Sequence, residues 1–278
     1  MIHNIISNYF VLLQQKTKRF LKYNDKVFLG LIIILGLFLR VISWYFEPTL
    51  SRDGILYLDL IKVWYNQNCF QAVLEYWPQY WIPPFPLYLM KLLMDCGCPA
   101  EFAGVGLNMI MGCGIPLIVY GIAMEMIHKR EIALCSALLI TLNPSMIELS
   151  IEIQRDMIYL FFCGLLIYFL LLGIRRKKRY FWSAAGVFFA ISYLTRYETL
   201  EFIPLALGCF VLLLIMDFSE WKKYIQNAVI LCVTSAVTLF ILIYAMGIQD
   251  HLYRTYLKYY QTRWFFFQKS YLEKGIKK

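Results

Sequence analysis

The sequence predicts an all-α membrane protein: a polytopic helical bundle of about seven transmembrane helices with a large first extracytoplasmic segment. Composition is the first reason. Of the 278 residues, 60% are hydrophobic and only 16% are charged, whereas a soluble domain carries about 25% charged residues. The second reason is that long apolar runs alternate with short basic clusters, the pattern of membrane spans and their cytoplasmic loops. Lipid is therefore the expected solvent for most of the chain.

Each predicted span is long enough to cross a hydrocarbon core of about 30 Å, which takes roughly 17–25 helical residues. The spans are approximately 27–46, 101–127, 131–149, 156–174, 180–197, 199–217 and 225–247. The first follows a basic stretch and lacks a small-residue cleavage site, so it is predicted to be a signal anchor. Residues 1–14 before it resemble an interfacial helix. No repeat or Gly/Ser linker divides the chain, so 1–278 is predicted to be a single domain.

The segment 47–100, between the first two spans, is predicted to lie outside the membrane and to contain juxtamembrane helices. Its apolar stretch 87–94 is too short to cross, so we expect a helix that docks on the outer face. With a cytoplasmic N-terminus, the basic clusters 128–130, 175–179 and 222–223 all lie inside, as the positive-inside tendency requires. The basic, aromatic tail 248–278 then lies outside, either on the headgroups or as the stub of a longer protein.

Charge and cysteine content argue against a nucleic-acid-binding protein and against a metal site formed by cysteines. The net charge of +9 does not indicate nucleic-acid binding, because Lys and Arg sit in short clusters between apolar runs. Three of the eight cysteines, Cys69, Cys96 and Cys98, fall in the outer segment. They are free thiols, or Cys69 forms one bridge with either of the other two. No His lies near them, so no metal site is expected there.

Charged residues converge on the predicted outer face from chain regions distant in sequence. Ionisable residues at membrane depth are costly and indicate a functional site. Those predicted at this face are Arg40, Arg52, Asp53, Glu148, Glu152, Arg155, Asp156, Arg196, Glu198 and Glu201. Taken singly, each has a structural alternative. Arg40 could snorkel to the interface, Arg155 and Asp156 could form a structural ion pair, and Asp53-Gly54 could be only a turn.

Both signs of charge at one membrane face suit the transfer of a group from a lipid-linked phosphate. Arginine binds phosphate oxygens bidentately and offsets the negative charge that grows on a departing phosphate. A carboxylate can take the proton of an acceptor hydroxyl. An apolar groove between helices can hold a polyprenyl chain, because each buried CH₂ contributes about 0.8 kcal/mol.

At these residues the chain resembles the GT-C superfamily of polyprenyl-phosphate-dependent glycosyltransferases. The nearest branch holds the protein O-mannosyltransferases and aminoarabinose transferases, glycosyltransferase family 39. The likeness covers about residues 28–217. The segments that carry it are Ser51-Arg52-Asp53-Gly54 with Tyr57, Pro83-Pro84-Phe85-Pro86-Leu87, Gln154-Arg155-Asp156 with Tyr159 and Leu160, and Leu194-Thr195-Arg196-Tyr197-Glu198.

The resemblance implies an inverting transfer of a sugar from a polyprenyl-phosphate-linked donor on the extracytoplasmic side. The acceptor would be a glycan, a lipid or a protein, and the bacterial inner membrane is favoured over the endoplasmic reticulum. The resemblance implies that Asp53 is the catalytic acidic residue and that Asp156 is a second acidic residue of the catalytic site, whereas Arg155, Arg196 and Arg52 match positions that contact the donor phosphate. Tyr57, Glu198 and Arg40 are assigned supporting roles. No metal and no cofactor are expected, because the chain has no compact motif of oxygen ligands.

Two other interpretations remain open at this point. The protein could be a transporter or flippase for a lipid or a small anion, with the charges lining its path. Against this, the charges gather at one face and no inverted repeat is evident. It could also be an inactive or truncated paralogue, since most members of the family continue with further helices or a soluble domain.

Overall fold

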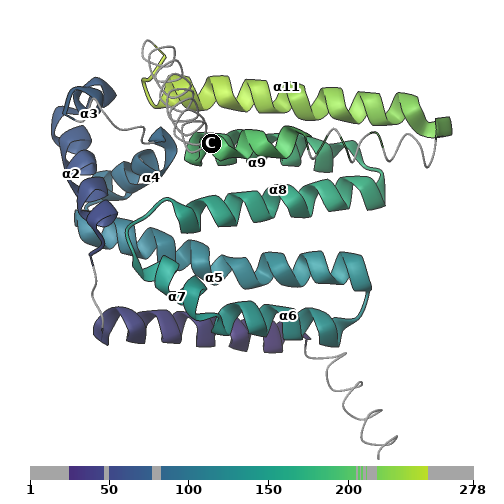
Figure 1. The fold of residues 1–278 in the computed structure, drawn as a ribbon, viewed down its shortest axis with the longest axis horizontal. Coiled ribbons are helices and arrows are strands. Elements are labelled where there is room, and N and C mark those ends of the chain that lie inside the picture. Colours follow the sequence, from purple (N-terminus) through teal and green to yellow (C-terminus); the bar gives the residue numbers. More distant parts are fainter. Residues whose placement is uncertain are drawn as a thin grey trace, which may run out of the picture.

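The computed structural model describes residues 25–46, 50–76, 83–204, 206, 208, 211 and 218–249. This part of the chain contains helices and no strand, which confirms the all-α prediction (Figure 1). The bundle is built from the helix Asp25–Phe46 and from α5 (Ala100–Ile127), α6 (Arg130–Leu142), α7 (Pro144–Ile151), α8 (Asp156–Arg176), α9 (Arg179–Thr195) and α11 (Trp221–Ala245). The shorter elements are α2 (Arg52–Gln67), α3 (Phe70–Tyr76), α4 (Pro84–Asp95), η1 (Tyr197–Glu201) and η2 (Phe218–Glu220).

The long helices lie side by side in the order α5, α8, α9, α11, with α6 and the helix Asp25–Phe46 beyond α5 (Figure 1). Within the described residues, four helices are long and apolar enough to cross a membrane: Asp25–Phe46, α5, α8 and α11. The pair α6 and α7, bent by 55°, makes a fifth span if it is counted as one. The chain is therefore an integral membrane protein.

The predicted number of seven spans stays a prediction. The predicted span 180–197 corresponds to α9, whose 17 residues are at the lower limit of length for a crossing. The predicted span 199–217 begins in η1 and falls largely outside the described residues. The interfacial helix predicted at 1–14 also lies outside them, as does nearly all of the tail 248–278.

The bend between α6 and α7 has a local cause. Pro144 lacks the backbone N–H that would continue α6 and is well suited to the first position of a new helix. The side chain of Asn143 caps that new helix by accepting hydrogen bonds from the backbone N–H groups of Ser145 (3.0 Å) and Met146 (3.3 Å). The break keeps the end of α7 close to α5, with which it packs.

The predicted outer segment forms α2, α3 and α4, which gather at one end of the long helices (Figure 1). The 12-residue helix α4 packs against α2, α5 and α9, and its Leu87 and Met90 are fully buried. This confirms the short docked helix predicted around 87–94. Cys69, Cys96 and Cys98 are exposed free thiols, so the alternative of a bridge from Cys69 is wrong.

Arg40 does not snorkel to the interface, as one interpretation of the sequence had it, because its side chain is buried at 1% exposure. Its guanidinium donates to Ser150 Oγ on α7 (2.9 Å), to the Gly112 carbonyl on α5 (3.2 Å) and to the Gly36 carbonyl on its own helix (3.0 Å). A buried charge is tolerated only when its donors are satisfied. Arg40 therefore ties together the helix Asp25–Phe46, α5 and α7.

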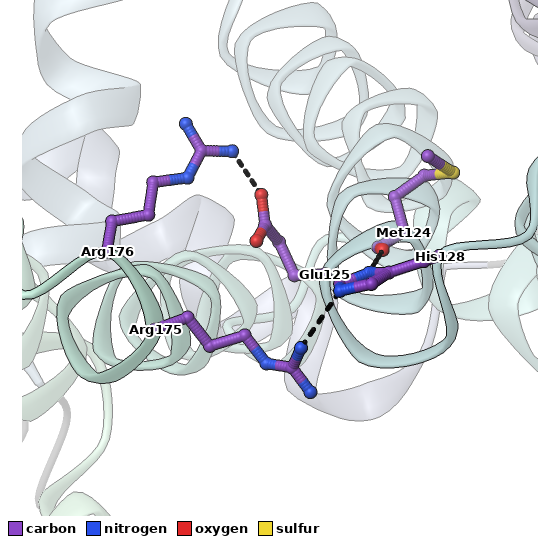
Figure 2. A network of polar contacts seen from close by, with 5 residues as sticks. All are labelled: Met124, Glu125, His128, Arg175 and Arg176. Carbon is purple, nitrogen blue, oxygen red and sulfur yellow. Dashed lines mark hydrogen bonds and ion pairs between the residues drawn. The ribbon is translucent and has the colours of Figure 1, made fainter.

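A polar network joins α5 and α8 at the end of the bundle opposite α2–α4 (Figure 2). Glu125 pairs with Arg176, and Arg175 donates to His128 Nε2 (3.2 Å). The other ring nitrogen of His128, Nδ1, lies 2.7 Å from the Met124 carbonyl oxygen. An Arg donor requires Nε2 to be the acceptor, which places the ring proton on Nδ1. The basic clusters 128–130 and 175–179 thus lie at the same end of the bundle.

Gly112 tests the contact that Arg40 makes between helices. A Cβ added at this position would lie 2.2 Å from Ser150 Oγ and 2.8 Å from Arg40 Nε, so we expect Gly112→Ala to destabilise the fold by about 1–3 kcal/mol. Gly106→Ala, on the same helix with nothing within 4 Å of its added Cβ, is the matched control. It should be neutral or stabilise by up to about 1 kcal/mol. Thermal unfolding of the purified protein in detergent measures both; equal unfolding temperatures would contradict the Arg40 contact.

Candidate functional site

The first part of the candidate site is the start of α2. Ser51 is the N-cap, and its Oγ accepts a hydrogen bond from the backbone N–H of Gly54 (3.1 Å). Asp53 lies in the first turn, where the helix dipole favours a negative charge. Its side chain is exposed and makes no hydrogen bond or ion pair with any described residue. Tyr57 follows one turn later on the same face but is buried, at 6% exposure.

The second part is the loop 152–155 between α7 and α8. Asn108, fully buried in the first third of the membrane helix α5, donates through Nδ2 to the carbonyl groups of Glu152 and Gln154. The side-chain amide of Gln154 in turn donates to Ser51 Oγ (3.3 Å) and to the Glu152 carboxylate. These contacts hold the loop against the start of α2, where a Cβ on Gly54 would come within 3.4 Å of the Ile153 carbonyl.

The third part is Arg196, which follows α9. Its guanidinium pairs with Asp156 at the start of α8 and lies 3.4 Å, Nε to Oε2, from Glu198 in η1. The guanidinium carbon lies 5.6 Å from the centre of the Tyr159 ring. Arg196 and Asp156 keep 33% and 31% of their side-chain surface exposed, so this ion pair remains in contact with solvent. Arg196 therefore links the start of α8 to the end of α9.

Electrostatic coupling indicates that these three parts form one site. Burial raises the pKa of the Tyr57 hydroxyl; among its charged neighbours, Arg155 and Arg196 lower it, whereas Asp156 and Asp53 raise it. The Glu152 carboxyl has a raised pKa because it is partly desolvated and has Glu148, Asp156 and Asp53 as like-charged neighbours, although the hydrogen bond from Gln154 opposes the shift. The pKa of Tyr57 is thus influenced by residues of α2, the loop 152–155, α8 and the end of α9. Two of these residues, Asp53 and Asp156, also influence the pKa of Glu152.

Most of the residues expected from the sequence are brought together here. They are Asp53, Tyr57, Arg155, Asp156, Arg196 and Glu198, and Arg52 is exposed next to Asp53 in the chain. The guanidinium of Arg155 makes no hydrogen bond or ion pair within the described part of the chain, whereas that of Arg196 is already held by two carboxylates. Arg40 does not join this cluster, because its donors are used by Ser150, Gly112 and Gly36. Its link to the site is indirect, through Ser150 near the loop 152–155.

Sequence reasoning missed Asn108, whose side chain supports that loop. The signal was present: Asn108 is a polar amide within the apolar run 101–127, and buried amides in membrane helices need hydrogen-bond partners. Its Oδ1 has no hydrogen-bond partner among the described residues.

The cluster combines a free arginine, an arginine paired with carboxylates and an exposed carboxylate at a helix N-terminus. The arginines suit recognition of a phosphate, and the carboxylate can accept a proton from a hydroxyl. In the described part of the chain, no three His, Cys, Asp or Glu side chains are grouped as ligands of a metal ion would be.

Comparison with known proteins identifies the family of this chain. A family model described as dolichyl-phosphate-mannose-protein mannosyltransferase matches residues 82–244, more than half of the 278-residue chain. The chain belongs to this family. It is thus a membrane glycosyltransferase of the GT-C type, as the sequence motifs indicated. Comparisons with curated proteins and with solved structures gave no match.

The family match covers only part of the candidate site. Arg155, Asp156, Arg196 and Glu198 lie within the residues that resemble this mannosyltransferase family, whereas α2 with Asp53 precedes them. The roles of α2 therefore depend on the contacts described above, chiefly the bond from Gln154 to Ser51 and the influence of Asp53 on Tyr57 and Glu152.

Glu152→Gln tests the crowding of acidic groups through the pH dependence of stability. The folded-state pKa of Glu152 is raised, so the folded protein binds this proton more tightly than the unfolded chain does. Stability contributed by that proton is present at low pH and is lost as the pH rises from the ordinary carboxyl pKa through the raised value. We expect wild type, but not Glu152→Gln, to lose unfolding temperature in this interval; parallel pH profiles for the two proteins would contradict the crowding.

Proposed function

We propose that this membrane glycosyltransferase transfers a sugar from a polyprenyl-phosphate-linked donor to an acceptor hydroxyl on the extracytoplasmic face, with inversion. The observation that carries the proposal is that the start of α2, which holds Asp53, contacts the loop 152–155 that leads into Asp156, and that Asp156 in turn pairs with Arg196. The description of the matched family, which names dolichyl-phosphate-mannose and protein, supports a lipid-phosphate donor and a protein acceptor. A glycan or a lipid is the other class of acceptor that this chemistry allows.

Arg155 is the residue best suited to bind the donor phosphate first, because none of its N–H groups is engaged by another described residue. Arg196 binds alongside, using the N–H groups that Asp156 and Glu198 leave open, since a guanidinium carries five donors. Asp156 is thus a positioning residue for Arg196. Arg52, exposed beside Asp53, adds positive charge at the edge of the site.

The transfer itself is a single displacement at the anomeric carbon of the sugar. The Asp53 carboxylate takes the proton of the acceptor hydroxyl as its oxygen forms a bond to that carbon. The bond between the anomeric carbon and the phosphate oxygen breaks on the opposite side, which inverts the configuration. The electron pair leaves with the polyprenyl phosphate, whose growing charge Arg155 and Arg196 offset.

The lipid part of the donor supplies affinity, whereas the charges supply chemistry. Each buried CH₂ of the prenyl chain contributes about 0.8 kcal/mol. The charged cluster lies beside the start of the membrane helix α8, so a donor whose chain stays in lipid can present its phosphate there. The cluster lies at one end of the long helices, which argues against the alternative of a transport path lined by charges.

Asp53→Asn tests the catalytic base. We expect transfer to fall by at least about 10²-fold, because the amide cannot take a proton from the acceptor. Transfer is measured with purified full-length protein, radiolabelled polyprenyl-phosphate mannose and a membrane extract as acceptor. Asp59→Asn is the matched control, since it removes the same charge from the same helix and lies outside the cluster. Full activity of Asp53→Asn would remove Asp53 from the mechanism.

Arg155→Ala and Arg196→Ala separate binding of the donor from support of the site. Arg155→Ala should raise the donor KM about tenfold or more and leave the unfolding temperature nearly unchanged, because it breaks no side-chain hydrogen bond or ion pair within the described part of the protein. Arg196→Ala should both raise the KM and lower the unfolding temperature, since it leaves Asp156 and Glu198 without their shared partner.

The control for these variants is Lys62→Ala, which removes an exposed cation from α2 outside the cluster. It should change neither quantity. A donor KM unchanged in both arginine variants would reject the phosphate role. Opposite effects, with Arg155→Ala destabilising and Arg196→Ala not, would contradict the assignment of Arg196 as the structurally held arginine.

A further inference from the structure

A cavity of about 210 Å³ lies at the end of the bundle opposite the charged cluster. It is bounded by the last turn of α8, the first turn of α9 and the start of α11. The side chains that matter in its lining are Lys177, Arg179, Trp182, Glu220, Lys223 and Gln226. None of these residues belongs to the glycosyltransferase site.

The lining has an excess of positive charge. It carries three cations, Lys177, Arg179 and Lys223, against the single carboxylate of Glu220. Lys223 pairs with Glu220 (2.7 Å), so that carboxylate is already used. Arg179 donates to the neutral amide oxygen of Gln226 (3.1 Å), and the side-chain ammonium of Lys177 makes no hydrogen bond or ion pair within the described residues. Two positive charges therefore remain without a counter-charge in the lining.

Neutral donors lie beside these cations. Trp182 is 9% exposed, and its indole N–H has no hydrogen-bond partner among the described residues. It packs against Gly173, where an added Cβ would lie 2.8 Å from the indole nitrogen. The side chains of Gln226 and Asn227 add amide N–H groups to the lining. Cations together with N–H donors form a site for the oxygens of an anion.

The position of the cavity identifies the source of that anion. The apolar helices α8 and α11 both have an end here. The exposed aromatic residues Tyr180 and Trp221 adjoin the lining residues Arg179 and Glu220 in the chain, and such aromatic residues are typical anchors at the membrane interface. Lipid phosphates lie at this depth, and basic pockets between membrane helices bind anionic headgroups. We infer that this cavity binds the phosphate of an anionic membrane lipid through Arg179, Lys177 and Lys223. The site is separate from the proposed transfer reaction and does not depend on it.

Two double variants test the site with the same loss of charge. Arg179→Gln/Lys223→Gln removes two lining cations. Lys178→Gln/Lys222→Gln removes their chain neighbours, which lie over the rings of Tyr180 (5.8 Å) and Trp221 (5.7 Å) and do not line the cavity. Native mass spectrometry of the full-length proteins in detergent counts bound phosphatidylglycerol, with phosphatidylcholine as the neutral-headgroup arm. A third arm adds inorganic phosphate at matched ionic strength as a competitor.

We expect wild type and Lys178→Gln/Lys222→Gln to retain phosphatidylglycerol, and the lining variant to bind it roughly tenfold more weakly. The unfolding temperature of each protein without added lipid shows whether the lining variant is still folded. Equal weakening in both double variants would overturn the site, because it would indicate general surface attraction. Equal binding of phosphatidylcholine in all proteins would overturn it too. Binding of inorganic phosphate but not of phosphatidylglycerol would overturn the lipid as the source.

If the lining variant unfolds, Trp182→Phe is used in its place. It keeps the ring and removes only the unpartnered N–H, so weaker phosphatidylglycerol binding than in wild type supports the site. If Trp182→Phe is folded and binds phosphatidylglycerol as wild type does, the indole N–H does not contact the lipid phosphate and the proposed site is overturned.

Discussion

The buried guanidinium of Arg40 is the contact on which the arrangement of the first helices depends. A charge removed from water needs partners for its donors, and the partners of Arg40 come from α5, α7 and its own helix. Gly36 and Gly112 make room for it, because a Cβ at either position would approach the guanidinium to within 3.2 Å. The approach of these helices is thus set by a polar contact rather than by apolar packing, which lipid provides equally well.

From Arg40 the same constraint leads to the functional end of the molecule. Ser150, which accepts from Arg40, lies in the last turn of α7, just before the loop 152–155. Asn108 holds that loop by its backbone carbonyls, and Gln154 connects it to the N-cap of α2. A series of hydrogen-bonded polar groups therefore runs from Arg40 to the start of α2. The cluster is thus supported by hydrogen bonds from α5 and the loop 152–155, and its Arg196–Asp156 pair stays partly exposed.

The outer segment and the charged motifs could be expected from the sequence because their signals are local. A stretch of eight apolar residues is too short to cross a bilayer, so α4 had to dock on other helices. Arg155 and Asp156 adjoin an apolar run, so they had to lie at a membrane interface. Their separate partners were not predictable in this way. Nothing in the order of residues 154–156 indicates that Asp156 pairs with Arg196 while Arg155 stays free.

By itself the sequence determined that this is a membrane protein, that it is helical and which family it belongs to, because hydrophobicity and short motifs do not depend on distant contacts. Only the tertiary structure decided the depth of Arg40, the support given by Asn108 and the free state of the outer thiols. Each of these depends on which helix lies opposite, and in lipid that is decided by small residues and paired polar groups scattered along the chain. An arginine near a helix end is equally compatible with the interface and the interior until its hydrogen-bond acceptors are known.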